Sequence, residues 1–364
     1  RYDAGWTFRR IEWGTWRELG EYGNISDAKF SRSAFDTLKL SGSLNYLGEP
    51  PDEIDAVSAT YSFRDSTGET VEHLAATFLV EAEEPTYASL ATGGYQKSGS
   101  AKFYSLLKVL SDTKCKVPYT VKAGTNAVGA ARRIVEAAGL RTNGPASDYT
   151  LSADHTFAAA DSMLTVVNWL LDAAGYASAD TDAAGTVLLV PYVEPTSRAT
   201  VWTFANDETS TISPGLDGEN DWRSAPNIVV CNYETDDEFL SAVAKNIDPD
   251  SRASLPSRNG RESSVVEEVS ELDGATQKER LENLKALAKK KLLDNSSEIQ
   301  YTKLETLFVP IDINSAAEVM YSGLERRGAV TSMDVTCDPS GTTSLKLREF
   351  IRRDLLIDVT ASAA

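Results

Sequence analysis

Hydrophobic and polar residues alternate along residues 1–116, a pattern that predicts β-strands. Apolar residues from Leu38 to Tyr46 recur at every second position, and the alternation returns in VSATYSFRD and in HLAATFLVEAEE. Gly42 interrupts the first apolar row, which indicates a bulge or a close approach of backbone. Turn chemistry separates these strands, at GEPPD, DSTG and a Gly-Gly pair. We therefore expect an antiparallel sheet or barrel over this region.

The pattern changes over 117–194, where two similar helical units follow one another. GTNAVGAARRIVEAAGL and DSMLTVVNWLLDAAGYAS both carry an apolar stripe at helical spacing, and both end in Ala-Ala-Gly-apolar. The residues that we expect to cap and to end the two helices are Thr125 or Asn126 with Gly139, and Asp161 or Ser162 with Gly175. After the second helix, YASAD and TVLLVPYV flank a turn at DTDAAG. We expect a small α/β insert of two helices packed on a short sheet.

Strand character returns over 195–236, in ATVWTFAN and NIVVCNY. The stretch 245–264 is polar and aperiodic, and we expect a loop or linker there. A helix is predicted over about 275–293, because leucines form a stripe and Thr276 with Glu279 makes a possible capping box. Strand patterns, a Pro-Ser-Gly turn and the segment SLKLREFIR follow this helix.

These patterns predict an α+β fold that is mainly β. We expect two related β-barrel-like tube domains, with an α/β insert and a long helix before the second β-domain. The expected domains are 1–116, completed by 195–236, as the first β-barrel-like domain; 117–194 as the α/β insert; and 237–364 as linker, helix and second β-barrel-like domain.

Acidic residues outnumber basic ones, which excludes several classes of partner. The chain has 364 residues with 54 Asp and Glu against 36 Lys and Arg, so its formal charge is −18. This balance argues against grip on nucleic-acid phosphates or an anionic lipid face, because both need clustered cations. No apolar run reaches the ~18 residues of a membrane span, and RYDAGWTFRR lacks the apolar core of a secretory signal. We expect a protein that folds in a cytoplasm.

Cysteine and histidine are scarce, which removes most thiol and metal chemistry. Cys115, Cys231 and Cys337 are odd in number and lie far apart, so a fully paired disulfide framework and a CxxC metal knuckle are excluded. We expect each cysteine to be a small buried hydrophobe. There are only two histidines, His73 and His155, which removes most histidine-based catalysis and most zinc sites, and His73 shows no metal-ligand spacing.

Two stretches of the insert superficially resemble ligand-binding loops and fail at defining positions. Gly124–Gly129 opens a helix as a phosphate loop does, but Ala130 and Ala131 stand where Lys-Ser/Thr is required. DTDAAG resembles the start of an EF-hand loop, but its fifth position is Ala184 and its twelfth is Pro191, so two oxygen ligands are missing. We interpret the first as a capped helix start and the second as a hairpin turn.

Catalytic constellations fail in the same way. His155 lies near Asp154, Asp161 and Ser162, but no G-x-S-x-G elbow and no oxyanion-hole motif is present, and we expect His155 in a surface loop. Acidic pairs suit solvated loops better than the facing carboxylates of a glycosidase. These pairs are Glu83-Glu84, Glu267-Glu268 and Asp236-Asp237-Glu238. We predict no catalytic, cofactor-binding or metal-binding residue, no cofactor and no enzymatic activity.

The densest aromatic cluster lies near the N-terminus. Its members are Trp6, Phe8, Trp13, Trp16 and Tyr22. Packing of a hairpin into a barrel core is the first interpretation, because large aromatic rings dominate cores. A sugar-binding platform and a protein interface stay open as alternatives.

Several strings, taken in order, resemble the tail hub proteins of long-tailed bacteriophages, a family related to the myophage baseplate hub and known as minor tail or tail-associated proteins. The most distinctive is YTVKAGTNAVGAARRIVEAAGL at 119–140. The others are AKFSRSAFDTLKLSGSLNY, ATFLVEAEEPTY, GSAKFYSLLKVLSD, LLDAAGYASADTDAAGTVLLVPYVEP, WTFANDETSTISPGLDGENDW and APNIVVCNY. The resemblance covers most of 28–300. PIDINSAAEVMYSG departs from it, because it lacks a Gly-Asp turn common in the family's last β segment.

The resemblance implies a structural tail hub. Such a protein forms a homotrimeric ring whose two related β-domains per subunit match a hexameric tail tube. The implied partners are the distal tail or tube-end protein, the tape-measure protein and tip or fibre proteins, with DNA passing through the lumen without sequence-specific binding. The implied location is the tail tip of the virion, after assembly in the host cytoplasm. Two alternatives stay open: a tail-associated cell-wall hydrolase and a cell-surface carbohydrate-binding tail protein.

Overall fold

The computed structural model of the chain is mainly β. It describes residues 4–64, 67–90, 94–193, 197–207, 212–213, 215–220, 225–235, 238–269, 272, 274, 276–296, 298–351 and 355–363. Strands make up 48% and helices 14% of the described residues, so the predicted α+β, mainly β fold is confirmed. Within these ranges no sheet closes into a barrel.

The order of elements follows the predicted sequence of β-region, insert, returning strands, helix and final strands. The helices are α1 Lys108–Asp112, α2 Ala127–Ala137, α3 Met163–Ala173 and α4 Gln277–Ser296. The strands are β1 Ala4–Ile11, β2 Glu18–Glu21, β3 Ile25–Ser33, β4 Leu40–Leu47, β5 Ala56–Arg64, β6 Thr70–Ala82, β7 Thr86–Ser89, β8 Tyr95–Ser105, β9 Tyr119–Val121, β10 Thr142–Asn143, β11 His155–Phe157, β12 Asp180–Thr181, β13 Val187–Leu188, β14 Thr200–Ala205, β15 Asp217–Asn220, β16 Ile228–Thr235, β17 Glu238–Asn246, β18 Ser264–Glu268, β19 Glu298–Leu307, β20 Ala316–Tyr321, β21 Leu324–Thr336, β22 Thr342–Ile351 and β23 Ile357–Ala363.

The chain forms two compact units. Unit 1 comprises Arg1–Gly215 and Leu304–Leu347, and unit 2 comprises Leu216–Lys303 and Arg348–Ala364. The N-terminal strands, the insert and the strands β20 and β21 therefore belong to unit 1. The three-part division expected from the sequence concerns parts that fold independently, and it stays a prediction.

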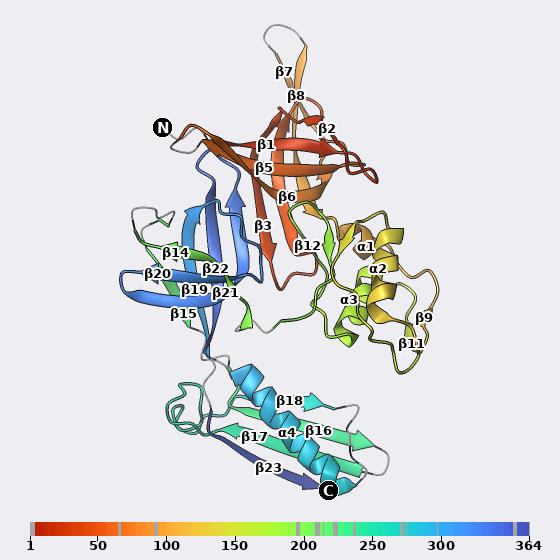
Figure 1. Ribbon diagram of the computed structural model, residues 1–364, viewed down its shortest axis with the longest axis vertical. Coiled ribbons are helices and arrows are strands. Elements are labelled where there is room, and N and C mark those ends of the chain that lie inside the picture. The colour runs from red at the N-terminus through yellow and green to blue at the C-terminus, as the bar shows by residue number, and fades with distance from the viewer. Residues whose placement is uncertain are drawn as a thin grey trace. The chain divides into compact units, whose positions relative to one another are not determined.

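The largest sheet brings together strands from the first and the last third of the chain. It has 14 strands in the order β15-β19-β22-β21-β3-β4-β8-β6-β5-β1-β2, with β20 paired to β21, β14 to β20 and β7 to β8. β3 pairs antiparallel with β21, from Ser33 opposite Ser332 to Lys29 opposite Thr336. N-terminal and C-terminal strands of unit 1 thus share one backbone ladder (Figure 1).

Alternation along the strands reflects one buried face of this sheet. Alternate residues of β3 from Ala28 to Arg32 are buried, while those between them are exposed. In the same core, Phe78 of β6 stacks on Phe103 of β8 with ring centroids 4.0 Å apart. A Cβ atom at Gly42 would overlap the Phe103 ring and a backbone oxygen of β3. The predicted close approach at Gly42 is confirmed.

The insert carries both predicted helices, and they are capped as predicted. Asn126 caps α2 and Ser162 caps α3, each accepting a hydrogen bond from the N–H three residues on, at 2.6 and 3.0 Å. Gly139 and Gly175 follow the helices with φ of 82° and 71°. Two small sheets, β10-β13-β12 and β11-β9, complete the insert, and the predicted DTDAAG hairpin is the β12–β13 pair (Figure 1).

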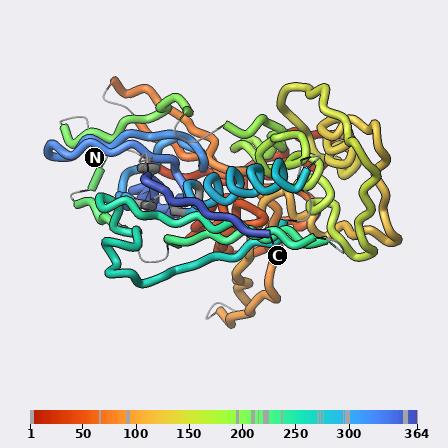
Figure 2. Tube along the Cα trace, turned by 90° about the horizontal axis from the view of Figure 1, so that it is seen from below, coloured from red at the N-terminus to blue at the C-terminus, as the bar shows by residue number. Residues whose placement is uncertain are grey.

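Unit 2 contains a helix packed on a four-stranded sheet. The strand order is β18-β16-β17-β23, and α4 lies across one face of the sheet, as Figures 1 and 2 show from two directions. Leu284, Ala288 and Leu292 of α4 are fully buried against β16 and β17. Thr276 and Glu279 form the predicted capping box through hydrogen bonds of 3.1 and 3.2 Å.

Candidate functional site

The two stretches of the insert that resemble ligand-binding loops stabilise the insert's own turns and helix. Asn126 Oδ1 accepts the N–H of Gly129, so the helix cap occupies the loop that resembles a phosphate loop. In the DTDAAG turn, Asp182 Oδ1 accepts the N–H of Thr186 at 2.8 Å. Over the part of the chain that the structure describes, no group of three or more His, Cys, Asp or Glu could hold a metal ion.

His155 lies in the short strand β11, so the expectation of a surface loop is wrong. Its ring stacks on Trp169 of α3, with centroids 3.9 Å apart and planes at 15°. The polar residues near it in sequence have structural partners: Ser162 caps α3, and Asp154 pairs with Lys122 at 2.8 Å. His155 is half-buried by this contact with Trp169, which no local sequence pattern indicates.

One residue of the Glu83-Glu84 pair and one of the Glu267-Glu268 pair have structural partners. Glu83 accepts a hydrogen bond from Ser100 at 2.6 Å, which is the main reason why the pKa of Glu83 is lowered. Glu267 pairs with Lys291 at 2.7 Å. Asp236 and Asp237 lie outside the described residues.

Two of the three cysteines are buried, as expected. Cys115 and Cys231 are buried, and Cys337 is half-buried. Burial raises the pKa of the Cys231 and Cys337 thiols. A raised thiol pKa lowers the thiolate fraction, so these two groups are poor nucleophiles.

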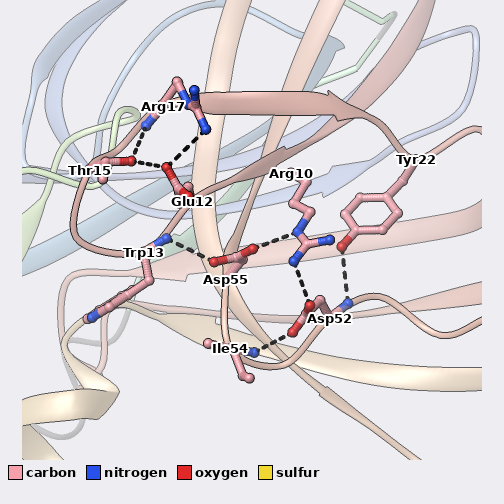
Figure 3. A network of polar contacts seen from close by, with 9 residues as sticks. All are labelled: Arg10, Glu12, Trp13, Thr15, Arg17, Tyr22, Asp52, Ile54 and Asp55. Carbon is pink, nitrogen blue, oxygen red and sulfur yellow. Dashed lines mark hydrogen bonds and ion pairs between the residues drawn. The ribbon is translucent and has the colours of Figure 1, made fainter.

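A polar network at the β1–β2 hairpin holds the N-terminal aromatics in place. Arg10 Nε donates to Asp55 Oδ2 at 2.6 Å, and Arg10 Nη2 donates to Asp52 at 2.7 Å (Figure 3). Asp55 Oδ1 accepts the backbone N–H of Trp13 at 2.9 Å. This hydrogen bond, together with Arg10, lowers the pKa of Asp55. The network fixes the hairpin to the segment that precedes β5.

Trp13 and Trp16 join this hairpin to the insert. Their ring centroids lie 5.3 Å apart, and both rings pack against the insert's apolar core. The guanidinium of Arg141 lies 4.5 Å from the Trp16 ring centroid, a cation–π contact. A Cβ at Gly139 would lie 3.2 Å from Trp13 Nε1. The two tryptophans are therefore packing residues, against the insert instead of inside a barrel.

Trp6 joins parts of unit 1 that are distant in sequence. Its ring centroid lies 5.1 Å from that of Tyr61 and 5.3 Å from that of Phe308. Its Nε1 donates to the carbonyl oxygen of Asp338 at 3.0 Å. Trp6 thus ties the N-terminal strand to the C-terminal part of the same sheet.

A buried charge cluster is the feature that sequence reasoning missed. Arg32 of β3 exposes 2% of its side chain, pairs with Asp180 at 3.2 Å and with Asp312, and donates to the Thr181 carbonyl at 2.8 Å. Burial raises the pKa of Asp180, and Arg32 opposes that shift. Burial likewise lowers the pKa of Lys39 nearby. The alternation along β3, which places Arg32 on the buried side, was the only sequence signal for this cluster.

Exposed strands and rings are the candidate contact surfaces. The β7–β8 hairpin extends beyond the rest of its sheet (Figure 1), and its Tyr87 and Tyr95 are 58% and 66% exposed. In the four-stranded sheet of unit 2, β18 and β23 are the edges. Open strand edges and exposed apolar patches are typical of surfaces that contact another chain. No helix in the described ranges is long and apolar enough to span a membrane.

Comparison with known proteins shows which fold this is. No protein-family model matches the sequence, and no curated protein matches it significantly. The structure matches the tail protein from Neisseria meningitidis MC58 with a TM-score of 0.61 and 15% identity, over 95% of this chain and 97% of the other. It matches the 43 kDa tail protein of prophage MuSo2 from Shewanella oneidensis with a TM-score of 0.59 and 11% identity, over 94% and 98%.

A third match comes from the Francisella PdpA–VgrG complex. Its TM-score is 0.53 at 8% identity, over 96% of this chain and 58% of the other. The chain has the fold of these proteins, of which the first two are tail proteins.

Proposed function

We propose that this chain is a structural protein of a phage-type tail tip, a tail hub. The observation that carries the proposal is the fold match along nearly the full length of two tail proteins, 97% and 98% of which are covered. The resemblance of the sequence strings to tail hub proteins supports the same class. A structural role without catalysis is part of the proposal.

In the proposed assembly, three copies form a ring that joins the end of the tail tube to the tip or fibre apparatus. The open edges β18 and β23 of unit 2 support this, because unpaired strand edges are commonly covered by another chain. The proposed partners are the distal tail or tube-end protein, the tape-measure protein and tip or fibre proteins. We place the insert, 117–194, on the outside of this ring.

The charge of the chain fits a conduit for DNA. Each copy carries a formal charge of −18, and a negative lumen would not adsorb a passing polyanion. The same charge opposes association of the copies, so we expect salt to favour the ring by screening the repulsion.

Oligomeric mass tests this proposal. Mass photometry or analytical ultracentrifugation at low and moderate ionic strength should show a trimer, with a larger trimer fraction at the higher salt. A protein that stays monomeric in every salt, and also in the presence of its tube-end partner, would contradict the hub. A zymogram on host peptidoglycan should show no clearing zone, and a clearing zone would favour the hydrolase alternative.

A matched pair of variants locates the contact between copies. Val266 on the edge strand β18 is 59% exposed, and Val117 of the insert is 69% exposed. Val266→Lys should lower the trimer fraction, because it places a desolvated charge at the proposed edge. Val117→Lys should leave the trimer fraction unchanged, because we place the insert outside the ring. The reverse result would move the interface to the insert.

A further inference from the structure

The insert contains two copies of one structural unit. Residues 113–140 and 149–176 align without a gap, and each residue of the second copy follows its counterpart by 36 positions, as His155 follows Tyr119. Both copies consist of a strand of 3 residues, a turn, an N-cap and a helix of 11 residues, followed by a glycine. Sequence identity between the copies is concentrated in the Ala-Ala-Gly at the end of each helix. The structure therefore reveals the duplication more clearly than the amino-acid sequence does.

Backbone angles agree at the special positions of the two copies. Gly124 has φ 78°, and its counterpart Ala160 has φ 79°. Left-handed backbone is unfavourable for alanine, so Ala160 does not adopt it by preference. The shared turn geometry imposes this conformation in both copies.

The segment before β11 completes the start of α2. Leu151 N–H donates to the Thr125 carbonyl at 3.0 Å, and the Leu151 carbonyl accepts the N–H of Gly124 at 2.8 Å. The Leu151 side chain is buried in the insert's core. The first copy therefore uses residues 149–151 of the second copy's leading segment as a partner for its helix turn.

The segment before β9 completes the start of α3 in the same way. Cys115, the counterpart of Leu151, donates its N–H to the Asp161 carbonyl at 2.8 Å, and its carbonyl accepts the N–H of Ala160 at 2.8 Å. The Cys115 side chain is buried in the same core. Each copy therefore lends its leading segment to the helix of the other.

The two strands meet at a local twofold axis. β9 and β11 pair antiparallel, with Thr120 directly opposite its own counterpart, Thr156. Their hydroxyl oxygens lie 2.8 Å apart. An antiparallel pair whose central residue faces its own counterpart, with reciprocal contacts on both sides, is the geometry of an isologous dimer interface.

We propose that the insert is an intramolecular pseudo-dimer, and that a second copy of this chain can supply the completing half. In the exchanged form, the α2 half of one chain folds with the α3 half of another. Residues 141–148, which include β10 paired with β13, connect the two halves in the chain. The closed and exchanged forms share the same contacts between the halves. Exchange of identical elements is a low-cost route to dimers for this reason. The proposal rests on the insert's geometry and not on the proposed tail function.

Two full-length variants, each with one cysteine added to the three native ones, test the exchange. Thr120→Cys and Thr156→Cys chains are mixed, unfolded in guanidinium chloride, refolded together at increasing protein concentration and oxidised. A disulfide between the two added cysteines requires halves from two chains to meet, because each chain carries only one of them, and links through native cysteines appear equally in each variant refolded alone. We expect a covalent heterodimer on a denaturing, non-reducing gel, in a share that rises with concentration. Such a gel reports covalent links only, so a non-covalent trimer does not affect it.

Three controls decide the result. The double variant Thr120→Cys/Thr156→Cys should form an internal disulfide in one chain, and its failure to do so would overturn the facing geometry. Each single variant refolded alone should show no covalent dimer above the wild-type background. Self-linking equal to that of the mixture would overturn the exchange. An internally bridged double variant combined with no heterodimer at any concentration would overturn it as well.

Discussion

The insert and the main sheet of unit 1 are specified over different distances along the chain. The insert's helices begin and end on neighbouring residues such as Asn126 and Gly139, and its two halves pair over 36 positions. The main sheet is completed by β3 with β21, and by Trp6 with Asp338, which are 332 positions apart. Local signals thus specify the insert, whereas contacts between the sequence ends of unit 1 specify the sheet. Arg32 lies where these two regions meet.

The largest effect is expected where the two regions are joined. Arg32→Ala would leave Asp180 without its buried cation, and we expect a loss of about 3–4 kcal/mol in the free energy of unfolding. Denaturant unfolding measures the loss, and limited proteolysis shows whether the insert is released first. Arg17→Ala is the control, because Arg17 is 70% exposed and should cost less than about 1 kcal/mol. Equal losses would show that the joint does not depend on Arg32.

The sheet alone can be strained at Gly42. Gly42→Ala places a methyl group against the Phe103 ring and a β3 carbonyl, and we expect a loss of about 2–3 kcal/mol. Gly5→Ala is the matched control in β1, because no atom lies within 4 Å of the added Cβ. Thermal unfolding compares the two, and an unchanged midpoint for Gly42→Ala would contradict the close approach.

Asp55, beside the main sheet, and Asp180, in the insert, should have opposite effects on how stability depends on pH. The pKa of Asp55 is lowered from 3.8, so its ionised form stabilises the fold, and this contribution is lost as pH falls through the lowered value. The pKa of Asp180 is raised from 3.8, so its ionisation opposes folding as pH rises through the raised value.

Conservative amide variants make this contrast measurable. The loss of stability in Asp55→Asn relative to the wild type should be constant above about pH 5 and should shrink as pH falls below 3.8. Asp180→Asn should gain stability relative to the wild type as pH rises above 3.8, because it cannot ionise. Denaturant unfolding at several pH values gives both slopes. Slopes of the same sign would refute the assignment of the two environments.

The smallest effect is expected inside the insert. Ala160→Gly should stabilise the chain by about 0.5–1 kcal/mol, because glycine adopts the φ of 79° without steric cost. Gly124→Ala, at the counterpart position, should destabilise it by about 1 kcal/mol. Scanning calorimetry resolves both shifts. A destabilising Ala160→Gly would contradict the equivalence of the two turns.

The elements that the sequence predicted correctly are those with local signals. Asn126, Ser162 and the Thr276–Glu279 box cap the helices at the predicted places, because a cap involves residues only three positions apart. The Ala-Ala-Gly sequence at the end of each helix indicated two similar units. The twofold axis between them was not readable, because it depends on how β9 and β11 pair.

The elements that could not be predicted depend on distant partners. The pairing of β3 with β21 joins segments that the sequence pattern assigned to separate domains. In the sequence, Arg32 looks like any polar residue of a strand, because its partners Asp180 and Asp312 are far away along the chain. His155 was placed in a loop because Trp169, which stacks on it, lies on another element. In each case the deciding contact joins two segments whose pairing no local pattern encodes.

The pairing of β3 with β21 sets an order of events during translation. Residues 29–33 leave the ribosome long before residues 332–336 are made, so the backbone edge of β3 stays unpaired through most of synthesis. Long-range strand pairing is slow, and open edges on unfinished sheets promote aggregation. The insert has its partners close by in the chain and can fold while synthesis continues. A prematurely terminated chain that ends before Ser332 would release a folded insert beside an unfinished sheet.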